Sequence, residues 1–148
     1  MKPKVHAIAG VIGFLMILSF WTSTILSELF ATHETIAAVK HAILYGMAIL
    51  IPAVAVAGAS GMNMGRKRKD TPALAKKRRI PFIAANGLLV LVPAAFFLES
   101  KASAGVFDGV FYAVQVLELV AGATNLFLMG LNIRDGRVMS RRRKQRHP

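Results

Sequence analysis

Residues 106–131 read VFDGVFYAVQVLELVAGATNLFLMGL, an apolar stretch interrupted by a few single polar residues. A helix needs about 20 mostly apolar residues to cross a lipid bilayer, and this stretch is longer than that. Three further apolar stretches cover residues 5–30, 35–59 and 80–98. Because each is close to or above the crossing length, the chain is predicted to be an all-α membrane protein with four transmembrane helices.

The overall composition supports the same class. The chain has 148 residues, of which 55% are apolar, and a mean hydropathy of +0.52, which exceeds that of an ordinary soluble domain. Short connections join the first pair of stretches and the second pair, so each pair is expected to form an antiparallel hairpin. The prediction is one domain over residues 1–148, an up-down four-helix bundle. The absence of cysteine excludes disulfides and thiolate metal sites.

Positive charge is concentrated in segments that such a bundle places on one side. The net charge is +12, and the basic residues gather at the N-terminus, in a connection at residues 60–79 and in a tail at residues 132–148. Basic residues in short loops mark the cytoplasmic side of a membrane protein. We therefore expect a multi-pass protein of a bacterial-type inner membrane with both termini in the cytoplasm.

The same basic runs are expected to contact anionic lipid headgroups, which attract lysine and arginine near the membrane surface. Nucleic-acid binding is disfavoured because no aromatic residue interleaves with either run. The residues assigned to headgroup contacts are Arg66, Lys67, Arg68, Lys76, Lys77, Arg78, Arg79, Arg141, Arg142 and Arg143.

Polar residues recur along one face of the fourth span. At about 100° per residue they fall within an arc of roughly 140°, and polar groups inside a membrane usually face the interior of the bundle. We interpret this arc as an inward polar stripe that crosses most of the membrane. It contains Asp108, Tyr112, Gln115, Glu118, Asn125 and Met129.

Two other spans supply candidate partners for this stripe. The second span carries Lys40, His41 and Tyr45 near its outer end. Lys40 is expected to reach outward to water or to pair with Glu28, Asp108 or Glu118. The third span carries Asn86 at a depth similar to that of Asn125, which predicts a hydrogen bond between the two amides.

The first span shares one face among His6, Gly10, Gly13 and further residues toward Glu28. Close helix packing accounts for this face more readily than a cofactor does, because small residues let backbones approach. A b-type haem held by His6 and Met129, or shared across a dimer, remains an alternative. No metal-site spacing or nucleophile motif is present.

Several residues predict where helices bend, begin and end. Pro52 and Pro93 lie inside spans and are expected to kink them. Thr35 is a candidate N-cap for the second span. Gly58–Gly61 and Asn132–Gly136 are expected to end the second and fourth spans.

These observations favour a non-catalytic accessory subunit or a small-ligand-binding module organised around the stripe. Its partner would be another membrane protein or a second copy of the chain. One alternative is a small redox protein that binds haem or quinone, with His41, Tyr45, Gln115 and Glu118 contacting the quinone. A second alternative is a proton or ion pathway along Tyr112, Gln115, Glu118 and Asn125.

Overall fold

The computed structural model describes residues 3–65 and 71–145, and these residues are helical apart from two short turns. The helices are α1 (Pro3–Phe30), α2 (His33–Gly65), α3 (Thr71–Asn86), η1 (Gly87–Leu91), α4 (Val92–Ser103) and α5 (Gly109–Gln145). Because α3, η1 and α4 follow one another without a break, they form one long rod. The predictions of an all-helical chain and of four long apolar helices are confirmed.

Four segments are long and apolar enough to cross a membrane: Lys4–Phe30, His33–Asn63, Leu74–Ser103 and Gly109–Arg141. Their outer faces expose large apolar side chains such as Phe82, which is 70% exposed, and Phe127, which is 67% exposed. Apolar surface of this extent would be a liability in water. Four helices of this length and surface are compatible with a multi-pass membrane protein.

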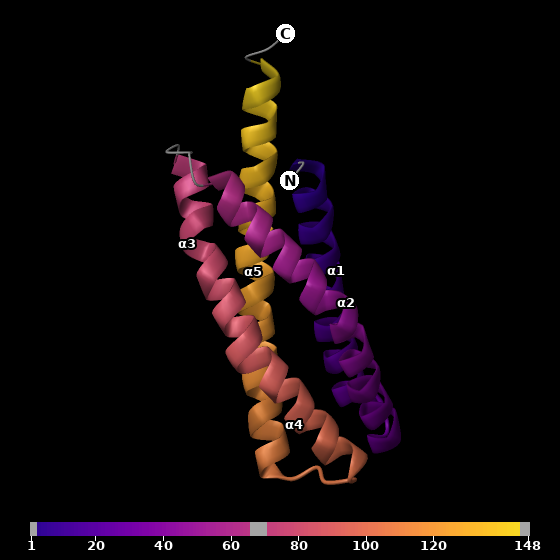
Figure 1. Cartoon of the computed structure of the whole chain (residues 1–148). Helices are drawn as coiled ribbons and strands as arrows, with labels where there is room; N and C mark the ends of the chain where they lie inside the picture. The colour runs from indigo at the N-terminus through magenta and orange to yellow at the C-terminus, as the bar shows by residue number, and fades with distance from the viewer. Residues whose placement is uncertain (1–2, 66–70, 146–148) are drawn as a thin grey trace.

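The four rods form a ring in which each packs against its neighbours in sequence. α1 packs on α2, α2 on α3 and α4, α3 and α4 on α5, and α5 closes the ring against α1. Within the described residues, α2 and α5 make no close backbone approach, and neither do α1 and the α3–α4 rod. These two pairs are the diagonals of the bundle. Both chain termini lie at one end of the molecule, here called the terminal end, and the α1–α2 and α4–α5 turns lie at the hairpin end (Figure 1).

The interior alternates between apolar and polar layers. Along α5 the inward residues from the hairpin end are Phe111, Glu118, Asn125, Met129 and Asp135. This near-heptad spacing keeps one face of a helix toward its neighbours over a long distance. Phe111 packs in an apolar layer at the hairpin end with Ile36, Leu98 and Ala102, and Met129 packs in a middle apolar layer with Ile17 and Ile83.

The irregularity expected near Pro93 is present as a π-helical turn. In η1 the amide of Val92 donates to the carbonyl of Gly87, one residue beyond the α-helical partner. Proline lacks an amide hydrogen and its ring collides with the carbonyl four residues earlier. The wider turn just before Pro93 relieves that conflict, so the rod continues as α4.

The predicted start and end of α2 were wrong. Thr32, not Thr35, is the N-cap, since its hydroxyl accepts a hydrogen bond from the Thr35 amide at 3.4 Å. Gly58–Gly61 does not end the helix, which continues to Gly65. A Cβ on Gly61 would lie 3.0 Å from the His6 ring, so this glycine allows close packing rather than terminating α2.

The predicted end of the last helix and the predicted length of the basic connection were also wrong. α5 runs through residues 132–136 and continues to Gln145. α3 begins at Thr71, so much of the 60–79 connection is helical as well. Arginine and lysine are good helix formers. A helix can therefore continue past the end of its apolar stretch into a basic segment. In Figure 1 the yellow end of α5 extends beyond the other helices.

Candidate intramembrane ligand site

Lys40 and Glu118 form an ion pair across the α2–α5 diagonal, in the layer below Phe111. The Lys40 ammonium donates to Glu118 Oε2 at 2.9 Å, and its side chain is only 1% exposed. Of the three acids predicted as possible partners of Lys40, Glu118 is the one that forms the ion pair. A buried charge needs such a partner because its desolvation is costly.

Two further polar residues adjoin this pair and leave acceptor atoms unpaired. Gln115 donates through Nε2 to Glu118 Oε2 at 3.0 Å, but its Oε1 is buried without a hydrogen-bond partner among the described residues. Glu28 Oε1 is buried and unpartnered in the same way, and Glu28 interacts electrostatically with Lys40 and Glu118. Buried acceptors are normally satisfied, so these two oxygens are exceptions among the described residues.

A cavity of about 60 Å³ lies next to the ion pair, between all four rods of the bundle. Glu118 and Thr24 are its polar lining residues, and Trp21 forms part of its wall. The indole of Trp21 donates to the Leu119 carbonyl at 2.9 Å and stacks close to Gly122, where a Cβ would lie 3.0 Å from the ring. The remaining lining residues are apolar: Ile17, Phe20, Ile43, Met47, Leu50, Leu91, Ala95, Leu119 and Gly122.

The predicted amide pair is formed between α3 and α5. Asn86 donates to Asn125 Oδ1 at 2.9 Å and to the Ala121 carbonyl at 2.8 Å. Asn125 in turn donates to the Ile83 carbonyl at 3.3 Å and is 1% exposed. The predicted hydrogen bond between Asn86 and Asn125 is confirmed, and it joins α3 to α5.

His6 belongs to a separate cluster near the terminal end. Its Nδ1 lies 3.0 Å from the Ala57 carbonyl and 3.0 Å from Ser60 Oγ, and its Nε2 lies 2.8 Å from the Lys76 ammonium. Since a carbonyl only accepts, Nδ1 carries the proton and Nε2 accepts from Lys76. Both ring nitrogens are engaged, whereas Met129 packs with Ile17 and Ile83. The structure therefore does not bring His6 and Met129 together as two free haem ligands.

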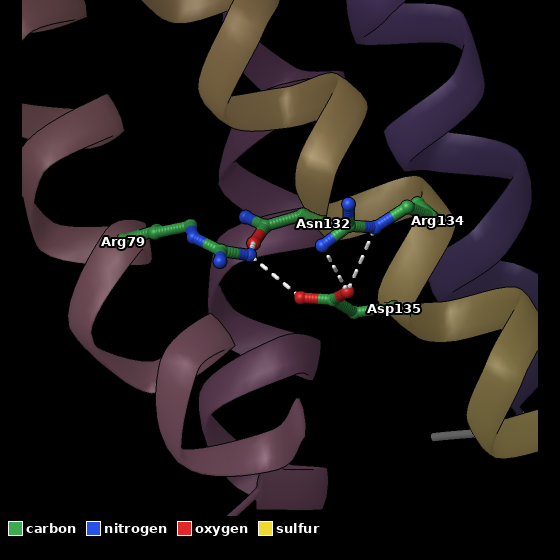
Figure 2. A network of polar contacts seen from close by, with 4 residues as sticks. All are labelled: Arg79, Asn132, Arg134 and Asp135. Atoms are coloured by element: carbon green, nitrogen blue, oxygen red, sulfur yellow. Dashed lines mark hydrogen bonds and ion pairs between the residues drawn. The ribbon is translucent and has the colours of Figure 1, made fainter. Parts of the chain in front are cut away.

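A network at the same end was not anticipated from the sequence (Figure 2). Arg79 of α3 donates to Asp135 Oδ2 of α5 at 2.7 Å and lies 3.5 Å from Asn132 Oδ1. Arg134 reaches the other oxygen of Asp135 at 3.3 Å. Two signals could have revealed this network: Asp135 is the sole acid in the basic tail, and Asn132 continues the spacing of Glu118 and Asn125.

Three residues expected near the centre lie on the outside instead. Tyr45 is 71% exposed and Tyr112 is 43% exposed. His41 is also exposed and bonds to Glu99 Oε1 at 2.9 Å. His41 follows Lys40 directly and so points about 100° away from it, and Tyr112 is at the edge of the predicted arc. Among the described residues, none of the three lines the cavity.

Asp108 likewise differs from its expected place in the stripe. It lies in the turn before α5, pairs with Lys101 at 2.5 Å and accepts from the Phe111 amide at 2.9 Å. It is thus the N-cap of α5. The hydrogen bond from Lys101, followed by that from the Phe111 amide, holds the pKa of Asp108 below its ordinary value.

The basic residues assigned to lipid headgroups divide into different environments. Lys76 and Arg79 turn inward to His6 and Asp135, so they do not lie on the lipid surface as expected. Arg78 and Arg141 are exposed and Lys77 is half-buried. Arg66, Lys67 and Arg68 lie outside the described residues, as do the side chains of Arg142 and Arg143.

Comparison of the chain with protein families, with curated proteins and with solved structures returned no match. The function must therefore be argued from the geometry of the polar centre and its cavity.

Proposed function

We propose that this protein is a non-catalytic membrane module that binds a small ligand in the cavity beside Glu118. One observation carries the proposal: Glu118 both pairs with Lys40 and lines the cavity. A ligand in the cavity would therefore meet a charged group that the protein already holds in a fixed position. Sites for small molecules are typically apolar hollows with a few placed polar groups.

The dimensions and lining define the class of ligand. A water molecule occupies roughly 10–15 Å³ of such a volume, so about 60 Å³ accommodates roughly four to six waters or one small organic molecule. The side chains of Phe20, Trp21 and Met47 form apolar walls, which suit a ligand with a short apolar chain as its body. The carboxylate of Glu118, which lines the cavity, suits a hydrogen-bond donor at one end of that body.

The test uses Trp21, the single tryptophan of the chain, as a reporter inside the cavity. Its fluorescence is followed in detergent while n-butylamine, n-butanol and n-butyrate are added, three straight-chain probes with four carbon atoms each. We expect saturable change with the amine, weaker change with the alcohol and none with butyrate. Glu118→Gln should remove the preference for the amine, and Gly122→Leu should remove binding by filling the cavity. If none of the probes saturates, or if Gly122→Leu behaves like the wild type, the proposal fails.

A second candidate function is a proton-binding centre, which the unpaired Glu28 oxygen favours. Two carboxylates, Glu28 and Glu118, share the single ammonium of Lys40. Proton relays in membranes are commonly built from such embedded acids. Proton flux in reconstituted vesicles would support this function if Glu28→Gln and Glu118→Gln each abolish it, and absent flux in the wild type would end it.

The orientation follows from charge rather than from the helices themselves. We propose that the terminal end faces the cytoplasm of a bacterial-type inner membrane, because the basic segments meet at that end. An alkaline phosphatase fusion at the C-terminus should be inactive, and a fusion at residue 105, in the α4–α5 turn, should be active. The opposite result would reverse the orientation.

A further inference from the structure

The terminal part of α5 carries a shallow groove of about 260 Å³ that is separate from the intramembrane cavity. Three arginines at spacings of three and four residues share this face of the helix. Gly130 and Ile133, here called the floor of the groove, line its end nearer the apolar segment. All lining residues belong to α5: Gly130, Ile133, Arg134, Arg137, Val138 and Arg141.

The groove straddles the boundary between apolar and charged sequence. The apolar stretch of α5 ends at Leu131, and the first arginine follows at Arg134. At 1.5 Å per residue, the groove from Gly130 to Arg141 is about 16 Å long. In a bilayer, Gly130 and Ile133 would therefore lie level with acyl chains, and the arginines would lie level with headgroups.

The arginines of the groove have little internal compensation for their charge. Arg134 shares Asp135 with Arg79. Arg137 and Arg141 are exposed, and neither has a carboxylate within bonding distance among the described residues. Asp135 is already paired with Arg79 and Arg134. The guanidinium groups of Arg137 and Arg141 are therefore left without a carboxylate partner among the described residues. Guanidinium groups recognise phosphate oxygens through paired hydrogen bonds.

We propose that this groove is a binding site for one anionic glycerophospholipid. Arg137 and Arg141 bind the headgroup phosphate, and an acyl chain lies over Ile133 and Gly130. The space above Gly130 is open, since a Cβ there would meet nothing within 4 Å. The proposal is independent of the cavity beside Glu118 and would stand if that cavity bound no ligand.

The test is a lipid titration of the full-length protein in detergent, followed by native mass spectrometry. Phosphatidylglycerol and phosphatidylcholine with identical acyl chains are compared. We expect the wild type to prefer phosphatidylglycerol. The double variant Arg137→Gln/Arg141→Gln should bind it roughly 25-fold more weakly. Arg78→Gln removes an exposed arginine from α3 and is the matched control, with an expected change below about twofold.

Two further arms distinguish a formed groove from diffuse attraction and from a soluble phosphate. Gly130→Leu fills the floor and keeps every charge, so it should weaken phosphatidylglycerol binding about tenfold, and Ile133→Ala should weaken it less. sn-Glycerol 3-phosphate, which lacks acyl chains, should not compete at the lipid concentrations used. Equal affinity for both lipids, wild-type binding by Gly130→Leu, or competition by glycerol phosphate would each overturn the proposal.

Discussion

Lys40 Nζ and Glu118 Oε2 lie 2.9 Å apart although they belong to α2 and α5, helices that face each other across a diagonal of the bundle. The two side chains therefore span the interior, and they do so directly beside the cavity. A buried ion pair of this kind is costly to break, because the remaining charge is left without its partner.

Replacing Lys40 with methionine should lower the free energy of unfolding by about 3 kcal/mol, because Glu118 would be left in the interior without its cation. The double variant Lys40→Met/Glu118→Leu should recover most of that loss, since no buried charge remains. Thermal unfolding in detergent measures both. Lys101→Met, which breaks an ion pair at the surface, is the control and should have a much smaller effect. Equal losses in the single and double variants would contradict the argument.

Asn125→Leu should destabilise the protein by about 1–2 kcal/mol. Asn125 accepts from Asn86 and donates to the Ile83 carbonyl, so leucine removes two contacts between α3 and α5. Thr124→Leu changes the adjacent exposed residue, which bonds only within its own helix, and should have little effect. If both variants unfold at the wild-type temperature, the amide pair contributes nothing to the packing of α3 on α5.

The contacts of His6 predict that its proton is on Nδ1. Nitrogen chemical shifts of selectively labelled histidine should show this tautomer, because Nδ1 faces the Ala57 carbonyl and Nε2 faces the Lys76 ammonium. Lys76→Met should change the Nε2 shift through loss of its donor. His41→Gln removes an exposed histidine and leaves the His6 signals unchanged. A His6 proton on Nε2 would disprove the arrangement.

The Lys101–Asp108 pair predicts a small acid-sensitive contribution to stability. Since the folded pKa of Asp108 is lowered chiefly by Lys101, its contribution is present above the unfolded value of about 3.9 and is lost as the pH falls through the folded pKa. Asp108→Asn keeps a capping side chain for α5 but loses the charge. Its melting temperature should therefore fall less than that of the wild type between pH 5 and pH 2. Identical acid dependence would show that the pair is not formed in solution.

The helices and much of the stripe could be predicted because hydrophobic periodicity alone determines which face of a helix is buried. Gln115, Glu118 and Asn125 lie where that reasoning placed them. The partner of Lys40 could not be chosen among three acids, because the periodicity of a helix does not say which helices lie across the bundle from one another.

Residues beyond the apolar stretches were harder to place. The sequence predicts Arg79 in a connection and Asp135 in a tail, because charged residues usually lie in solvent. In the structure α3 and α5 continue side by side past their apolar parts, and the inward positions there are filled by oppositely charged groups. Helix packing in this protein thus extends beyond the apolar stretches.

The His6–Lys76 contact joins α1 to α3 across the second diagonal, at the opposite end from Lys40–Glu118. The two contacts thus connect the two pairs of diagonally opposite rods, one pair near each end of the bundle. At each of these two levels, moving the diagonally opposite rods apart would break the contact that joins them. Among the described residues, the two hydrogen bonds on the terminal side of the Lys40–Glu118 pair, from Trp21 to Leu119 and from Asn86 to Asn125, join only neighbouring rods. The cavity therefore has a contact between opposite rods on its Glu118 side and contacts between neighbouring rods further along.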